Sequence, residues 1–239
     1  MLDAQPCFRQ HFALAWSARF GFSQTLILAH HAFLVMTETI YFYGTKGEHG
    51  CLSNFFPCKI IHKGILYTSA EQAMMHHKAL LFNDSVRADA IMATNNPAEC
   101  KKLGRKVTPY VDSIWVSARG NIVSDIIRDK FTQNAAIGKH LVGTFPSTLA
   151  EASPSDRIWG IGLSVQNAEE GKQWRGTNLL GNILMTTRDQ HLDASRKWTP
   201  PAKDIEIVVE QCKVSPEIAV RALQANYGDV VNAIMAVSV

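Results

Sequence analysis

The sequence predicts a mostly helical α+β domain with a small β-sheet, followed by a small domain of three helices. Segments with helix-start signals outnumber the short β-branched and aromatic segments, and the two kinds alternate irregularly, unlike in a doubly wound sheet. The chain has 239 residues, of which 46% are hydrophobic, so it can bury a substantial core. Two prolines after Lys197-Trp198-Thr199 indicate a linker before the last three helix signals.

The chain divides into four segments. We expect residues 1–35 to be a non-structural extension or a transit-type leader, because the segment has almost no acids and Met36-Thr37-Glu38 resembles an alternative start. The main domain is predicted over residues 36–195, the linker over 196–203 and the small domain over 204–239. A unit as short as the last one must pack its apolar residues tightly.

Short strands and capped helices make up the first half of the main domain. β-branched and aromatic residues favour strands, and a Lys63-Gly64 turn favours a hairpin. Thr68 with Glu71, and Ser69 with Gln72, have the spacing of a capping box, and no Gly or Pro interrupts the helix that follows. The predicted elements are a strand at 39–43, a hairpin at 59–67, and helices at 68–82, 83–94 and 96–104.

Caps and breakers set the limits of the other helices. Asn96-Pro97-Ala98-Glu99 supplies a cap, an N1 proline and an acid, and Gly104 ends that helix. Asp112 can cap a long helix at 114–131, which carries a stripe of apolar residues at near-helical spacing. Further helices are predicted at 137–141, from Asn178 to about Leu192, and after Asp204, Ser215-Pro216-Glu217 and Gly228-Asp229.

Composition excludes several classes of protein. The net charge of +3 is too small to indicate, by itself, a surface that binds nucleic acid. Five cysteines without a C-x-x-C pair suit a reducing compartment, so we expect a cytoplasmic or nuclear location unless residues 1–35 act as a transit segment. No segment approaches the roughly 20 apolar residues of a membrane span.

We expect neither a metal nor a cofactor. The sequence lacks His-Glu-x-x-His, and His76 and His77 would point about 100° apart on a helix. Nucleophile elbows and Walker-type loops are also absent from the sequence.

The predicted helix at 68–82 carries the first candidate site. Glu71 and Lys78 are seven residues apart, which places them almost in line and about 10 Å apart along the axis. Because the surrounding residues are apolar, these two groups leave room for a ligand between them. The alternative is that Glu71 is only a capping residue and Lys78 a surface lysine with a buried stem.

Each of the other polar and aromatic candidates can be interpreted as a binding residue or as a structural one. Asp156 precedes Trp159-Gly160-Ile161-Gly162, whose glycines could let backbone N–H groups approach a phosphate. Arg105 could anchor a diphosphate or lie on the surface. Asn178 could cap a helix or hold a ribose or phosphate. Trp115 and Trp159 could stack on a base or sugar, although isolated tryptophans are more often core residues.

Several motifs occur together in one order. They are Tyr41-Phe42-Tyr43, Leu52-Ser53-Asn54-Phe55, Tyr67–Gln72 with Lys78, Lys102-Leu103-Gly104-Arg105, Trp115, Lys130-Phe131, Glu151-Ala152-Ser153 through Gly162, and Trp174-x-Gly176-x-Asn178-Leu179-Leu180-Gly181. In this order they resemble the NADAR (NAD- and ADP-ribose-associated), or YbiA-like, family of N-glycosidases over about residues 39–192. The resemblance implies a YbiA-like fold and hydrolysis of an N-glycosidic bond. One branch of that family acts on early riboflavin-pathway intermediates, and another removes ADP-ribose from guanine in nucleic acid.

The resemblance also implies roles for individual residues. Carried over by position, the catalytic candidates are Glu71, Asp156, Trp115 and Lys78, and the substrate-binding candidates are Asn54, Phe55, Arg105, Trp159, Gly160, Gly162 and Asn178. Glu71 would contact the ribose hydroxyls or the developing cation, and Asp156 would activate water or orient the sugar. In a variant mechanism, Lys78 attacks the opened sugar as a Schiff base.

The expected substrate is ADP-ribosylated guanine in nucleic acid or nucleotide. The loop Trp-Gly-Ile-Gly-Leu at 159–163, with Ala-Ser-Pro before it, is more typical of the ADP-ribose-handling branch. A riboflavin-pathway substrate remains an alternative, and so does a non-catalytic ADP-ribose reader coupled to an adaptor module.

The C-terminal segment carries a second resemblance. It rests on Asp204–Gln211, Ala219–Leu223 and Asp229–Met235 in that order. Together they resemble a ubiquitin-associated (UBA) domain of the kind found in the nascent-polypeptide-associated complex. This implies ubiquitin or another protein as a partner; the alternative is a self-associating helical appendage.

Overall fold

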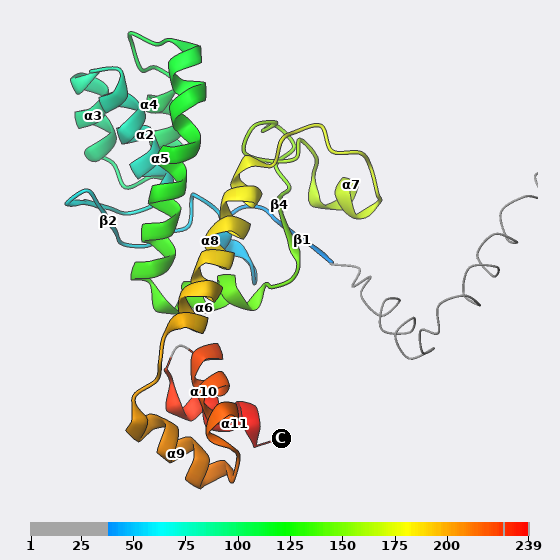
Figure 1. Ribbon diagram of the computed structural model, residues 1–239. Helices are drawn as coiled ribbons and strands as arrows, with labels where there is room; N and C mark the ends of the chain where they lie inside the picture. Colours follow the sequence, from blue (N-terminus) through cyan, green and yellow to red (C-terminus); the bar gives the residue numbers. More distant parts are fainter. Residues whose placement is uncertain (1–37, 227, 239) are drawn as a thin grey trace, which may run out of the picture. The chain divides into compact units, whose positions relative to one another are not determined.

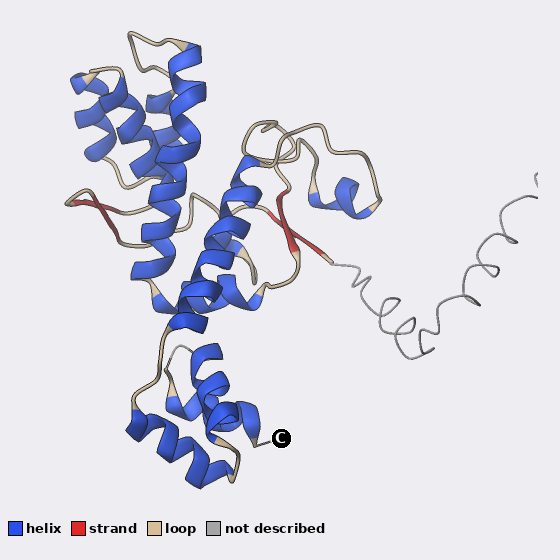
Figure 2. Cartoon of the chain, viewed as in Figure 1, coloured by secondary structure: helices blue, strands red, loops and turns tan. Residues whose placement is uncertain are grey.

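The computed structural model describes residues 38–226 and 228–238, so the predicted leader at 1–35 lies outside the described residues. Helices dominate this part of the chain, as predicted (Figure 2). Figure 1 labels most of the elements. They are β1 (Thr39–Phe42), a 3-10 turn (Gly50–Leu52), β2 (Ile60–His62), β3 (Ile65–Tyr67), α2 (Ala70–Leu81), α3 (Ser85–Met92), α4 (Pro97–Gly104), α5 (Asp112–Gln133), α6 (Ala135–Gly143), β4 (Thr148–Glu151), α7 (Val165–Glu169), α8 (Leu179–Lys197), α9 (Ala202–Cys212), α10 (Pro216–Ala225) and α11 (Val230–Val237).

Two small sheets take the place of the one that the sequence predicts. β2 and β3 form the expected antiparallel hairpin, and both turn residues, Lys63 and Gly64, have the positive φ of a tight hairpin turn. β1 instead pairs in parallel with β4, with Phe42 opposite Glu151 at the end of the register (Figure 1). β4 was not predicted, and it brings Glu151 next to the first strand of the domain.

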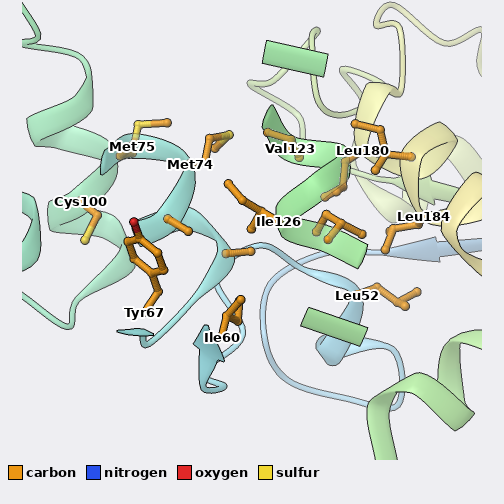
Figure 3. Packing of buried hydrophobic residues seen from close by; sticks show 14 of the residues in the cluster. Leu52, Ile60, Tyr67, Met74, Met75, Cys100, Val123, Ile126, Leu180 and Leu184 are labelled. Atoms are coloured by element: carbon orange, nitrogen blue, oxygen red, sulfur yellow. The ribbon is translucent and has the colours of Figure 1, made fainter. Parts of the chain in front are cut away.

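α2 is the centre of the main domain. Ser69 caps it, because the Ser69 Oγ accepts a hydrogen bond from the Gln72 amide, and the Gln72 side chain accepts one from the Thr68 amide. α2 packs against α3, α4 and α5. In Figure 3, Met74 and Met75 lie among Cys100 of α4 and apolar residues of α5. Nearly all faces of α2 are therefore buried, which is unusual for a helix that carries a glutamate and a lysine.

Several helix limits differ from the predicted ones. Asp112 is the first residue of α5 and accepts a hydrogen bond from the Tyr110 hydroxyl rather than capping the helix. α8 continues to Lys197, beyond the predicted end at Leu192. α9 begins at Ala202, so Asp204 lies in its first turn, where a negative charge still favours the helix dipole.

The C-terminal helices α9–α11 enclose a core of their own. Val208, Ala219, Leu223 and Ala233 are fully buried there. Asp229 caps α11 by accepting a hydrogen bond from the Asn232 amide. The predicted three-helix unit is therefore confirmed. Throughout the described residues, helices that combine the length and apolar character of a membrane span are absent.

Candidate active site

Glu71, the second residue of α2, is the most unusual polar residue of the main domain. Its side chain is only 2% exposed, and its Oε1 atom has no hydrogen-bond partner in the described part of the chain. The Glu71 amide donates to the Asn54 carbonyl oxygen at 2.9 Å, which brings Asn54 against the start of the helix. The buried Asn54 Oδ1 atom also lacks a donor. Since unpaired buried acceptors cost about 1–3 kcal/mol each, they suggest a binding site.

Charged groups from three other segments act on Glu71. The pKa of Glu71 is raised to about 8, chiefly by burial, and the neighbouring carboxyls of Glu151 and Asp156 contribute to this rise. Lys101 and Arg105, on α4 and at its end, oppose this shift. At neutral pH the Glu71 carboxyl is therefore mostly protonated.

Asp156 holds its own loop together. Its Oδ1 atom accepts hydrogen bonds from the Ile158 and Trp159 amides, at 3.0 and 2.8 Å. Its Oδ2 atom lies 3.6 Å from Lys101 Nζ. Lys101 in turn lies over the Phe55 ring, 5.7 Å from its centroid. Lys101 thus connects Asp156 and Phe55 with the charged groups that act on Glu71.

The two glycines of this loop allow close packing. A Cβ atom on Gly160 would lie 2.7 Å from the Glu151 carbonyl oxygen, so any larger residue would displace β4 or the loop. Gly162 has a φ of +70°. The amides of Ile161 and Gly162 donate to carbonyl oxygens of Glu151 and Asp156. These two amides are therefore engaged within the loop rather than directed at a phosphate.

Asn178 fastens the same loop to β4. It stands at the start of α8 in a left-handed conformation, and its side chain makes no capping hydrogen bond. Instead, its Nδ2 donates to the Leu149 carbonyl oxygen at 2.8 Å, and its Oδ1 accepts from the Glu151 amide at 3.1 Å. Trp159 is half-buried against the main core, and its carbonyl oxygen accepts from the Leu180 amide.

Lys78 belongs to a second group, two turns further along α2. Its Nζ donates to the Gly104 carbonyl oxygen at 2.9 Å and lies over the Tyr110 and Trp115 rings, at 4.5 and 5.6 Å from their centroids. Burial lowers the pKa of Lys78, while Asp112 partly opposes that shift. Met75, which lies between Glu71 and Lys78 on the helix, packs against Gly104. Hence the stretch of helix between the two charged groups is occupied by Met75.

The histidine pair on α2 is engaged with a tyrosine. The Tyr67 hydroxyl lies 2.8 Å from His76 Nδ1 and 3.4 Å from His77 Nε2. In the part of the chain that the structure describes, no three His, Cys, Asp or Glu side chains are arranged to hold a metal ion.

Comparisons with known protein families and solved structures show which proteins this chain resembles. The NADAR domain matches residues 41–191, which is more than half of the chain. The chain belongs to the NADAR family. Among solved structures, the NMR structure of Escherichia coli YbiA matches with a TM-score of 0.58 and 27% identity over 69% of this chain and 91% of that one. The predicted family and YbiA-like fold are thereby confirmed.

Two curated relatives carry informative names. N-glycosidase R617 of Acanthamoeba polyphaga mimivirus is 46% identical over 52% of this chain and 75% of its own length. Riboflavin biosynthesis protein VVA0006 of Vibrio vulnificus is 30% identical over 65% of this chain and 39% of its own length. The C-terminal residues 201–238 match the HYPK UBA domain, which confirms the second predicted resemblance.

The NADAR domain of this chain also contains two charged residues that were not among the predicted site residues. Lys101 is the cation nearest to Asp156, and Glu151 has a buried Oε2 atom without a partner in residues 38–226 and 228–238. Burial raises the pKa of Glu151 to about 7, and Asp156 adds to this effect. Glu151 lies within the motif that begins at Glu151-Ala152-Ser153, but the sequence does not reveal its pairing in β4 or the burial of its Oε2 atom.

Proposed function

We propose that this NADAR-family chain is an N-glycosidase that removes ADP-ribose from guanine in nucleic acid or nucleotide. The observation that carries the proposal is the buried Glu71 carboxyl, whose Oε1 atom has no hydrogen-bond partner in the described residues and on which two further carboxyls and two cations act. The names of the relatives support N-glycosidase activity as the general class. The ADP-ribose substrate is supported by the cations Lys101 and Arg105, since a diphosphate requires positive charge near the ribose.

Hydrolysis of an N-glycosidic bond suits a site that combines carboxyl groups with cations. An N-glycosidic bond breaks through an oxocarbenium-like transition state, which a nearby carboxyl group can stabilise. In the proposal, Glu71 contacts the ribose, Lys101 and Arg105 bind phosphate, and Asp156 orders the loop that carries Trp159. Because Arg105 and part of Lys101 are exposed, a diphosphate could reach them from solvent.

The test is release of free ADP-ribose from an oligonucleotide that carries ADP-ribosylated guanosine, measured by liquid chromatography with mass detection. We expect turnover by the wild type and a loss of at least about 100-fold in Glu71→Gln. Glu169→Gln, on the exposed surface of α7, is the matched control and should keep the wild-type rate. If the wild type binds ADP-ribose but releases none, the chain is a reader rather than an enzyme.

A second candidate substrate is an early riboflavin-pathway intermediate, favoured by the name of the Vibrio vulnificus relative. The two substrates differ in charge, because ADP-ribose carries a diphosphate. Both should be assayed side by side with Arg105→Gln. If Arg105 serves the diphosphate, its loss raises KM for the ADP-ribosyl substrate. A wild type that turns over only the riboflavin intermediate would exclude the ADP-ribosyl proposal.

The Schiff-base variant can be tested separately. Burial lowers the pKa of Lys78, which favours a neutral and nucleophilic amine, but Nζ donates to the Gly104 carbonyl oxygen and lies over two aromatic rings. Borohydride added during turnover should trap a lysine adduct if the variant operates. Peptide mapping without an adduct at Lys78 would eliminate it.

For the C-terminal unit, we propose a protein partner, with ubiquitin as the first to be tested. The match to the HYPK UBA domain supports this. Labelled residues of α9–α11 should show chemical-shift changes on titration with ubiquitin. If no shifts appear and the chain sediments as a dimer, the self-association alternative is favoured.

We also propose a reducing location, in the cytoplasm or nucleus. It is supported by the four described cysteines, Cys51, Cys58, Cys100 and Cys212, which are all free thiols. Fractionation of cells that express the full chain tests this.

A further inference from the structure

The loop that joins β4 to α8, which contains α7, is fastened to itself at its two ends (Figure 1). The Arg175 amide donates to the Ile161 carbonyl oxygen at 2.8 Å, and the Thr177 amide donates to the Arg157 carbonyl oxygen at 3.0 Å. Both arginines are exposed, although the backbone at each of them is engaged in these hydrogen bonds. Their side chains therefore leave the loop from fixed points.

Gly162 shows that these two side chains lie next to each other. A Cβ atom on Gly162 would lie 3.1 Å from Arg157 Cγ and 3.2 Å from Arg175 Cβ. The stems of Arg157 and Arg175, which we call the arginine pair, thus approach the same point of the loop. Because like charges repel, two guanidinium groups on neighbouring stems favour an anion that binds to both.

The arginine pair is not neutralised by the protein itself. In residues 38–226 and 228–238, neither of its guanidinium groups forms an ion pair with a carboxylate. Neighbouring cations are engaged instead: Lys172 Nζ lies 2.9 Å from Glu170 Oε2, and Lys101 Nζ lies 3.6 Å from Asp156 Oδ2. The arginine pair is therefore a local positive surface, in a chain whose net charge is only +3.

The place of the arginine pair in the sequence connects it with the candidate active site. Arg157 directly follows Asp156, and Ile158, the next residue, is 42% exposed before the half-buried Trp159. The Ile158 carbonyl oxygen accepts from the Leu179 amide at 3.0 Å, so its apolar side chain is also held in a fixed position. Exposed arginines beside an exposed apolar side chain suit phosphates and a neighbouring base of a nucleic-acid strand.

We propose that the arginine pair binds backbone phosphates of the nucleic-acid strand that carries the modified guanine, so that the substrate is a polymer rather than a free nucleotide. This inference rests on the proposed N-glycosidase function and names its substrate class. Lys101 and Arg105, on α4 and at its end, serve the diphosphate of ADP-ribose. A nucleotide within a strand adds phosphodiesters on both sides of its base, and these are the anions left for the arginine pair. Such contacts position a strand without reading its sequence.

Binding of an unmodified, fluorescently labelled single-stranded oligonucleotide tests the arginine pair without turnover. Anisotropy at several salt concentrations gives the slope of log K against log salt, to which each phosphate contact contributes about 0.7. The double variant Arg157→Gln/Arg175→Gln should bind more weakly and reduce that slope by about 0.7 to 1.4. Arg128→Gln is the matched control, because Arg128 is already paired with Asp125 at 2.9 Å on α5. A double variant with the slope and affinity of the control would overturn the proposal.

Two further arms identify the source of the phosphate. Replacing both arginines by lysine keeps the charges and should restore most of the wild-type slope. Saturating free ADP-ribose should leave the labelled oligonucleotide bound to the wild type, since the two ligands use different cations. Complete displacement by ADP-ribose would show that the arginine pair serves the diphosphate, and would overturn the proposal.

Kinetics separates this proposal from the proposed function. With an oligonucleotide that carries ADP-ribosylated guanosine, the Arg157→Gln/Arg175→Gln variant should raise KM about tenfold. If the wild type binds the oligonucleotide through the arginine pair but releases no ADP-ribose, the proposed function fails and the nucleic-acid surface stands. If the wild type releases ADP-ribose and the double variant keeps its KM and its salt slope, the surface fails and the proposed function stands.

Discussion

Glu71 combines near-complete burial with a carboxyl oxygen that has no donor in the described structure. Such a group costs folding free energy, since a buried acceptor without a partner is not compensated for lost hydration. This cost in folding free energy stays low only while the Glu71 carboxyl is protonated. A residue that destabilises the fold in its charged state is expected where function requires it.

This gives a pH dependence of stability. The pKa of Glu71 is raised from 4.5 to about 8 by burial, so between these values the folded chain binds a proton that the unfolded chain does not. Wild-type stability should therefore fall across this range as pH rises. Glu71→Gln lacks this loss. Because one pKa unit corresponds to about 1.4 kcal/mol, the stability gap between variant and wild type should grow by a few kcal/mol from pH 5 to pH 8. Urea unfolding at both pH values measures it, and a constant gap contradicts the expectation.

Lys130 has the opposite charge but is equally buried. It is 0% exposed, and its Nζ donates to the Cys51 and Ser53 carbonyl oxygens at 2.6 and 2.8 Å. These bonds hold the turn that leads to Asn54. Replacing Lys130 with Met should destabilise the fold by about 2–4 kcal/mol, because the Cys51 carbonyl oxygen loses its donor and the Ser53 carbonyl oxygen keeps only the Phe56 amide.

Chemical denaturation measures this loss. Lys46→Met, at an exposed position, is the control and should change stability by less than about 0.5 kcal/mol. A Lys130→Met chain as stable as the control would contradict the structural role of these two hydrogen bonds.

At the scale of elements, the cap of α2 positions Glu71. The Ser69 side chain accepts a hydrogen bond from the Gln72 amide at 3.1 Å, directly beside the catalytic candidate. Ser69→Ala should cost about 1 kcal/mol of stability and also lower kcat, because the first turn of α2 loses its anchor. Ser117→Ala, on the exposed surface of α5, provides the comparison. Equal stability of the two variants in thermal melts would argue against the cap.

Elements defined by local signals could be predicted from the sequence. The hairpin at 59–67 and the capped helix α2 depend on turn residues and on side-chain-to-backbone bonds within a few residues. β4 could not be predicted in this way, because Thr148–Glu151 becomes a strand by pairing with residues far earlier in the chain. For the same reason Glu151 was missed as a site residue.

Local sequence patterns also fail to predict the role of side chains whose partners lie far away in the sequence. Asn178 occupies a helix start, where a cap is the expected role, but its amide group bonds to β4. Lys78 is interpreted from the sequence as a surface or pocket residue, whereas the fold places its amine over the rings of Tyr110 and Trp115. Tertiary contacts decide such cases, and a single sequence does not reveal them.

At the scale of the whole molecule, the C-terminal helices have their own core and their own family match. If they act only as an adaptor, removal of residues 203–239 should leave kcat/KM for the N-glycoside within about threefold of the full chain. Parallel assays of both chains measure this. A loss of more than about tenfold, with an unchanged melting temperature of the main domain, would show that the helices contribute to catalysis.

The parallel pair of β1 and β4 has a consequence for synthesis on the ribosome. β1 leaves the exit tunnel first, but its partner strand follows about 100 residues later, a delay on the order of ten seconds at about 5–20 residues per second. Until then the growing chain contains Glu71 but lacks Glu151, Asp156 and the loop between them. Nascent chains that stall before β4 therefore carry an unpaired strand and no complete catalytic cluster, which makes them natural clients for chaperones during translation.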